Sequence, residues 1–182
     1  MNKCKDFVGG LIVDKFAGTI ADTVTVELHD AVTYATIVYR ATGVELHQDG
    51  TCNSPGLGFI NIPSTITGSY YITIKSRNHL ETTTATPVLL AASTSYNFTT
   101  AATQAFGSNM ALVNTGVYGV YVGDVNQDGV VNVTDLSLTL TQLISGTVGY
   151  NVTDVTGDGQ VNVIDNSTIL TSLINGVSKM NP

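Results

Sequence analysis

The sequence predicts a mainly β N-terminal part, folded as an antiparallel sandwich, followed by a small α module at the C-terminus. Short runs of β-branched and aromatic residues recur over residues 10–115, with turn clusters between them. Residues 124–148 and 154–178 are identical at fourteen of twenty-five positions, so the C-terminal part contains an internal repeat. We place the boundary between residues 1–118 and 119–182. No Pro/Ser-rich linker separates the two parts, which predicts a stiff connection.

Composition excludes several classes of function. The chain has 182 residues, a net charge of −7, 43% hydrophobic and 12% charged residues, which is typical of a folded protein. Its seven scattered cations form no basic patch for nucleic acid or an anionic membrane surface. The longest apolar runs are too short to span a bilayer. No signal peptide is visible, because the apolar stretch after the N-terminal lysines is short and interrupted by Gly9 and Gly10.

The N-terminal part contains seven runs with strand character. Turn residues such as Gln48–Gly50 and Asn53–Gly56 separate them, and this spacing is typical of an antiparallel β-sandwich. The predicted strands cover residues 23–28, 34–39, 58–62, 70–75, 88–91, 96–99 and 110–113.

Each copy of the repeat begins with the pattern Asp-x-Asn/Thr-x-Asp-Gly-x-Val-Asn-x-x-Asp. Side-chain and backbone oxygens at this spacing can surround a calcium ion, and glycine at the sixth position allows the sharp turn. The same residues could form metal-free Asx turns, but two copies in register favour a metal. We therefore predict two calcium ions. The expected ligands are Asp124, Asn126, Asp128, Val130 (carbonyl), Asn132 (through water) and Asp135, then Asp154, Thr156, Asp158, Gln160 (carbonyl), Asn162 and Asp165.

A helix is predicted after each loop, and a glycine follows each as a stop signal. No helix is predicted before either loop, so the unit is loop–helix. The apolar residues expected on the packed helix faces are Leu136, Leu140, Leu143 and Ile144 in the first copy, and Leu170, Leu173 and Ile174 in the second.

This tandem of loop–helix units, each closed by Asp, resembles the dockerin family over residues 121–178. The resemblance implies a calcium-dependent module of extracellular bacterial assemblies that docks on a cohesin domain. The contacts it implies are Val133, Thr134, Leu140, Thr141, Val163, Ile164, Leu170 and Thr171. The sequence departs from the family pattern because residues 116–178 contain no Lys or Arg, and Leu136 and Leu138 are replaced by Asn166 and Thr168 in the second copy.

No catalytic set is recognisable, so we expect a protein without enzyme activity. His29, His47 and His79 are isolated in the sequence, and the three glutamates stand in no recognisable acid–base context. Tyrosines on the predicted strands could stack on sugars, but packing within the sandwich is the favoured interpretation. These tyrosines are Tyr34, Tyr39, Tyr70 and Tyr71.

These observations predict an extracellular or cell-surface calcium-binding assembly protein, bacterial by resemblance. Its partner is expected to be either a cohesin-like domain or other copies of the chain, joined head to tail into a filament or surface layer. The alternative is a carbohydrate-binding β-module that binds polysaccharide and is anchored through its dockerin to a cellulosome-like complex.

Cys4 and Cys52 are either free thiols or one disulfide.

Overall fold

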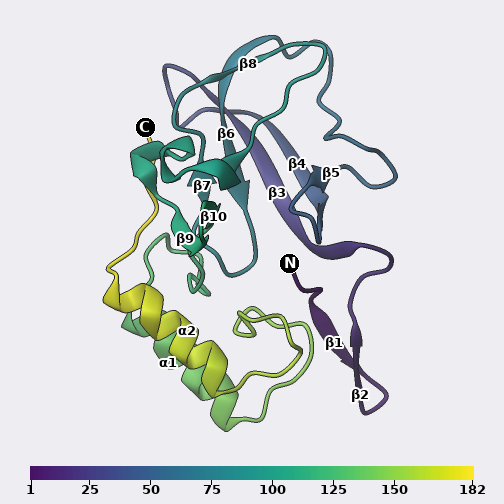
Figure 1. Cartoon of the computed structure of the whole chain (residues 1–182), viewed down its shortest axis with the longest axis vertical. Helices are drawn as coiled ribbons and strands as arrows, with labels where there is room; N and C mark the ends of the chain where they lie inside the picture. Colours follow the sequence, from purple (N-terminus) through teal and green to yellow (C-terminus); the bar gives the residue numbers. More distant parts are fainter.

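The computed structural model describes residues 1–182 and has three regions: a main antiparallel sheet, two helices beyond one end of it, and an N-terminal hairpin beside the loops of the C-terminal repeats (Figure 1). The prediction of a mainly β chain with a small C-terminal α module is confirmed. The strands are β1 (Lys5–Val8), β2 (Leu11–Asp14), β3 (Ile20–Asp30), β4 (Ile37–His47), β5 (Cys52–Asn53), β6 (Gly68–Lys75), β7 (Thr82–Thr83), β8 (Val88–Leu90), β9 (Ala111–Asn114) and β10 (Val117–Gly119). The helices are α1 (Val133–Ile144) and α2 (Val163–Ile174), with 3-10 turns at Phe98–Thr100, Ala102–Gln104 and Phe106–Ser108.

The main sheet has the strand order β5-β4-β3-β6-β7, and β8 also pairs with β6. All of these pairings are antiparallel. Alternate residues of β3 point to one face, so Val24 and Val26 pack with Ala41 and Val44 of β4 in a buried cluster. Ile60, from the long loop between β5 and β6, covers part of this cluster.

Two predicted strands are absent, and the reason is local. Residues 58–62 form a loop rather than a strand, and the run at 96–99 leads into a 3-10 turn. Pro55 and Pro63 flank the first of these segments, and proline cannot donate a backbone hydrogen bond to a sheet. The strands that do form make one large sheet and two separate hairpins, β1–β2 and β9–β10.

The hairpin β1–β2 was not among the predicted strands. Gly9 and Gly10, which interrupt the apolar stretch, form its two-residue turn. Both have positive φ, +59° and +87°, as a type I′ turn requires. The glycine pair is therefore what allows the apolar stretch to fold back on itself.

The C-terminal part has its own hydrophobic core, which contains one residue from the N-terminal part. Leu80, in the loop between β6 and β7, is buried in this core, and its backbone N–H donates to the carbonyl of Tyr121 at 2.8 Å. The other buried members are Val125, Val131, Val155, Ile169 and Val177. The division into residues 1–118 and 119–182 stays a prediction, and the two parts share this core.

The predicted packed faces of the helices are only partly correct. Leu136 and Leu173 pack against the core. The positions that point most directly inward are Thr139 and Ile169, both fully buried. The helix surface that meets the core is therefore rotated from the predicted apolar stripe. Ile144 and Ile174 of that stripe are exposed, as are Leu140 and Leu170, which are also predicted partner contacts.

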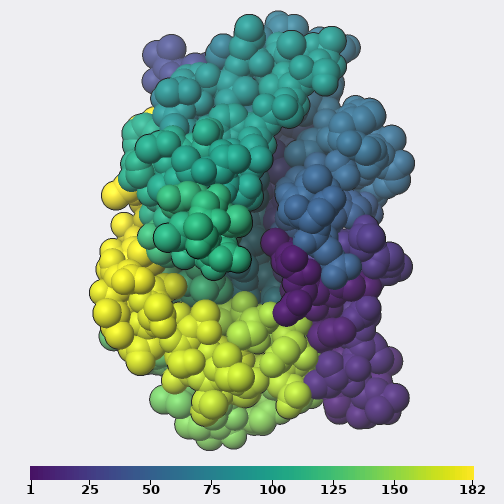
Figure 2. Space-filling view, viewed as in Figure 1, coloured from purple at the N-terminus to yellow at the C-terminus, as the bar shows by residue number.

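Both ends of the chain contact the opposite part: the N-terminus lies against the C-terminal part, and the C-terminus lies against the N-terminal part (Figure 2). At the N-terminus, the backbone N–H of Lys5 donates to the carbonyl of Gly157 at 3.0 Å. At the C-terminus, Asn181 contacts the hydroxyl of Tyr34 and the carboxylate of Glu81. Cys4 and Cys52 are free thiols in the structure, which leaves no disulfide between them.

We predict that Leu80→Ala lowers the unfolding free energy of the calcium-loaded chain by about 2–4 kcal/mol, because it leaves a cavity in the core of the C-terminal part. Urea unfolding followed by circular dichroism measures this change. Leu89→Ala, at an exposed position of β8, is the matched control and should change the unfolding free energy by less than about 0.5 kcal/mol. Equal effects of the two variants would contradict a shared core.

Candidate functional site

The first Asp of each loop is buried and holds the turn at the loop's glycine. In the first loop, Asp124 accepts a hydrogen bond from the N–H of Gly129 at 3.0 Å. In the second, Asp154 accepts from the N–H of Gly159 at 2.9 Å. The other carboxylate oxygen of Asp124, Oδ1, is buried and has no hydrogen-bond partner. An unsatisfied anionic oxygen in this position calls for a cation.

The closing Asp of each loop joins the start of the loop to the start of the helix. Asp135 Oδ1 accepts from the N–H groups of Val125 and Asn126 at 2.9 and 3.2 Å, and its Oδ2 accepts from Asn132 N–H at 3.0 Å. Asn132 in turn caps helix α1, so loop and helix form one unit.

The second loop repeats this arrangement. Asp165 Oδ1 accepts from the N–H of Thr156 at 3.0 Å, and its Oδ2 accepts from Asn162 N–H at 2.9 Å. The hydroxyl of Thr156 also donates to Asp165, at 3.0 Å. The remaining predicted ligand positions are exposed or half-buried at the outer side of the loops: Asn126, Asp128, Val130, Asn132, Asp158, Gln160 and Asn162.

The electrostatics of the loops reflect several carboxylates held close together. Burial, with the charges of Asp135 and Asp128 adding to it, raises the pKa of Asp124 to about 6. Burial and the charge of Asp165 likewise raise the pKa of Asp154. Both shifts mean that a proton or another cation stabilises these groups in the folded chain.

The donor set fits a hard cation, since every predicted ligand atom is an oxygen. No three His, Cys, Asp or Glu side chains converge on one metal position. The residues that the structure brings together in each loop are two buried carboxylates, Asp124 with Asp135 and Asp154 with Asp165. The unpartnered Oδ1 of Asp124 is the observation that matches a bound cation most directly.

All eight predicted partner-contact residues are exposed on the helices or at their first turns. Val133 and Val163, which begin the two helices, are 66% and 71% exposed. Further along, Ile144 and Ile174 add apolar surface near the helix ends. In Figure 1 the helices lie side by side at the end of the molecule away from most of the main sheet.

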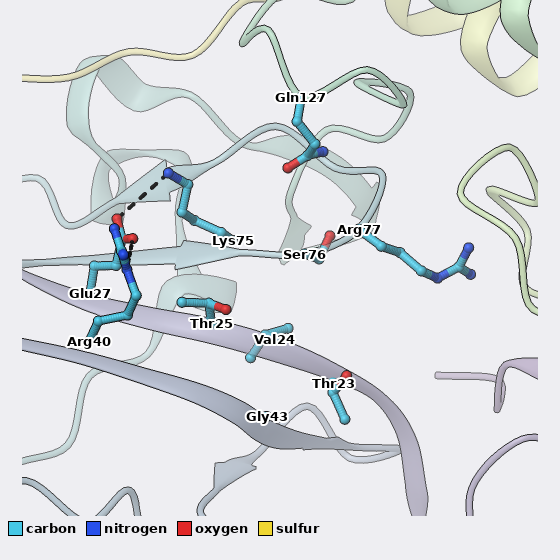
Figure 3. A pocket seen from close by; sticks show the side chains of 10 residues that line it. All are labelled: Thr23, Val24, Thr25, Glu27, Arg40, Gly43, Lys75, Ser76, Arg77 and Gln127. Atoms are coloured by element: carbon cyan, nitrogen blue, oxygen red, sulfur yellow. Dashed lines mark hydrogen bonds and ion pairs between the residues drawn. The ribbon is translucent and has the colours of Figure 1, made fainter.

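A polar cleft of about 360 Å³ lies between the main sheet and the first loop, where Gln127 lines it (Figure 3). Glu27 lines one side of it, and its buried carboxylate accepts from Arg40 Nε at 2.6 Å and lies 3.6 Å from Lys75 Nζ. Arg77 points away from this group, toward Asp22 and the linker between the repeats. The cleft is therefore a place where side chains of the two parts meet, with its charges largely paired.

The histidines and tyrosines considered in the sequence make internal contacts. His29 stacks on Tyr34 and hydrogen-bonds to its carbonyl. His79 bonds to the Ser76 hydroxyl, and burial lowers the pKa of His79 to about 4. The ring of Tyr71 packs edge-on against Tyr34, and the hydroxyls of Tyr39 and Tyr70 donate to backbone carbonyls.

Most of the C-terminal part is similar to a known family of domains. Residues 122–175 match the family model of the dockerin type I domain. No curated protein matches the chain. No helix is long and apolar enough to cross a membrane.

Two crystal structures of type II cohesin–X–dockerin complexes from Acetivibrio cellulolyticus are similar to this chain. The complex mutated at its N-terminal interface aligns with 16% identity and a TM-score of 0.46, covering 87% of this chain and 83% of the other. The complex mutated at its C-terminal interface aligns with 14% identity and a TM-score of 0.49, covering 96% and 94%.

Sequence reasoning missed the residues outside the dockerin segment that contact it. Leu80 and Asn78 lie in a loop of the N-terminal part, and nothing in their local sequence indicates a role in a module forty residues away. One difference between the repeats could have pointed to these contacts: Gln127 of the first repeat is replaced by Gly157, which has no side chain, in the second.

We predict that the contribution of Asp124 to the stability of the calcium-free chain falls as the pH rises from 5 to 7, and that it is measured as the difference between wild type and Asp124→Asn, because the lowered pKa of His79 acts in the opposite direction over the same range. The pKa of Asp124 is raised to about 6 in the folded state, above its ordinary value of 3.8, so the folded chain holds the proton more tightly. The stabilisation by this proton is complete below pH 3.8, the ordinary pKa of Asp, and is lost as the pH rises through about 6. Urea unfolding in a chelator at both pH values measures it. Relative to wild type, Asp124→Asn should gain stability as the pH rises from 5 to 7, because the variant keeps the His79 contribution and loses that of Asp124. The same slope in both chains would contradict the assignment to Asp124.

Proposed function

We propose that this chain is a non-catalytic assembly protein that binds a cohesin-like domain through the outer surface of α1 and α2. The observation that carries the proposal is the exposed apolar surface formed by residues such as Val133, Val163 and Ile164 in a dockerin type I segment. Large apolar side chains left exposed together on one element are typical of a protein-binding surface. The proposed contacts are Val133, Thr134, Leu140, Thr141, Val163, Ile164, Leu170 and Thr171.

We also propose that the two loops each hold one calcium ion. Calcium would supply the positive charge that the buried carboxylates of Asp124 and Asp154 lack, and it would order the start of each helix. The second site is expected to be weaker, because the neutral hydroxyl of Thr156 stands where the first has Asn126. The proposed ligands are Asp124, Asn126, Asp128, Val130, Asn132 and Asp135 in one site, and Asp154, Thr156, Asp158, Gln160, Asn162 and Asp165 in the other.

An extracellular or cell-surface location follows from this proposal, since modules of this kind stay loaded where calcium is abundant. The N-terminal β part would then be carried into an assembly by the C-terminal dockerin. The internal contacts of the four tyrosines favour packing over a sugar-stacking surface.

Titration calorimetry on the chelator-treated chain should give two calcium ions per chain. Asp135→Ala and Asp165→Ala should each remove one of them, because each closing carboxylate belongs to one loop. Asp30→Ala, at an exposed turn outside the loops, is the control and should leave two. A wild-type chain that binds no calcium would contradict the proposal.

Docking is tested by biolayer interferometry of the full chain against purified type I and type II cohesin domains, in calcium and in chelator. Wild type should bind a cohesin only in calcium. Ile164→Asp should weaken binding by roughly 30-fold or more, because it places a charge in the apolar surface. Leu112→Asp, at a similarly exposed position on β9, should not weaken it.

Light scattering on the same samples without cohesin separates the two kinds of partner. A mass that grows with calcium and falls with chelator would mean that the partner is a second copy of the chain, as in a filament. A chain that stays monomeric and binds no cohesin would contradict docking through the helices.

A further inference from the structure

One residue of the N-terminal part forms hydrogen bonds at the start of both repeats. Asn78 is fully buried, in the connection between β6 and β7. Its backbone carbonyl accepts from the N–H of Gly123, directly before the first loop, at 2.8 Å. Its side-chain amide donates to the carbonyls of Val152 and Asp154 at 3.0 and 3.1 Å. Asn78 therefore bonds to the residue that precedes the first loop and to the first residue of the second.

Comparison of the two repeats shows what the Asn78 amide replaces. In the first repeat, the side-chain amide of Gln127 donates to the carbonyl of Asp124 at 2.6 Å, a bond made within the loop. Thirty residues further on, the equivalent of Gln127 is Gly157, which has no side chain. The equivalent carbonyl, that of Asp154, receives its amide hydrogen bond from Asn78 instead.

The N-terminal strand explains why the second repeat has glycine at this position. Gln127 and Gly157 have similar backbone conformations, with φ of +60° and +75°. A Cβ atom on Gly157 would lie 3.1 Å from the sulfur of Cys4, tighter than ordinary van der Waals contact. Lys5 N–H also bonds to the Gly157 carbonyl. A side chain at residue 157 would press against Cys4, and with glycine there the amide donor to Asp154 comes from elsewhere in the chain.

We propose that Asn78 is a positioning residue for the second calcium site, supplying from the β part the amide that the first repeat supplies for itself. The inference rests on the proposed calcium function. By bonding to Val152 and Asp154, Asn78 fixes the turn that enters the second loop and so orients the Asp154 carboxylate toward the loop amides. The second site then depends on the β part, whereas the first site has its own donor.

The test follows the two sites separately during a calcium titration of the full chain by NMR. The reporters are the backbone amides of Gly129 and Gly159, which donate to the carboxylates of Asp124 and Asp154. In Asn78→Ala, calcium affinity reported by Gly159 should fall roughly tenfold, the effect of losing two hydrogen bonds, while that reported by Gly129 stays as in wild type. Asn114→Ala, an exposed asparagine on β9, should leave both affinities unchanged.

Equal losses at both reporters, or none at either, would overturn the role of Asn78 while leaving the calcium proposal intact. A wild-type Gly159 signal that does not respond to calcium would overturn the calcium proposal itself. If Asn78→Ala does not fold, the titration of the wild-type chain is the test. The NMR signals of the Asn78 side-chain amide should then shift over the same calcium concentrations as the Gly159 amide. Asn78 signals that do not shift with calcium would overturn the inference.

Discussion

The closing aspartates, Asp135 and Asp165, are the groups on which the C-terminal part depends. Each is fully buried and accepts backbone hydrogen bonds from the beginning of its loop and from the residue that caps its helix. One carboxylate thus fixes where the loop closes and where the helix begins. Because hydrogen bonds to a charged acceptor are among the stronger ones, loop and helix are held as one unit. The exposed apolar surface is presented by helices positioned in this way.

The buried carboxylates of the two loops destabilise the folded chain unless their negative charge is neutralised. Asp124 and Asp154 are buried near the closing aspartates, and burial with like charges nearby raises the pKa of both. A divalent cation offsets this repulsion, which is why the calcium proposal and the buried geometry support one another. Hydrophobic packing alone is a small contribution in a module of this size, and the core includes Leu80 from the β part.

The two repeats have diverged where the rest of the chain meets them. Gly157 makes room for the N-terminal strand, and Gly149, whose added Cβ would lie 2.9 Å from Asp6 Oδ1, stands where the other copy has Lys179. Both glycines have positive φ. The β part therefore meets the second repeat and the segment before it through specific contacts. That the connection is stiff stays a prediction from the absence of a Pro/Ser-rich linker.

The sequence by itself determined the repeat, the loop–helix units and the mainly β N-terminal part, because these depend on local spacing, turn residues and strand character. The tertiary structure alone decided how the helices face the core: Ile144 and Ile174 satisfied the apolar periodicity, yet they are exposed and Thr139 and Ile169 are buried. It also decided that Asn78 and Leu80 complete the C-terminal part. Contacts between residues more than forty positions apart depend on how the sheet and the repeats pack, and local patterns carry no record of that packing.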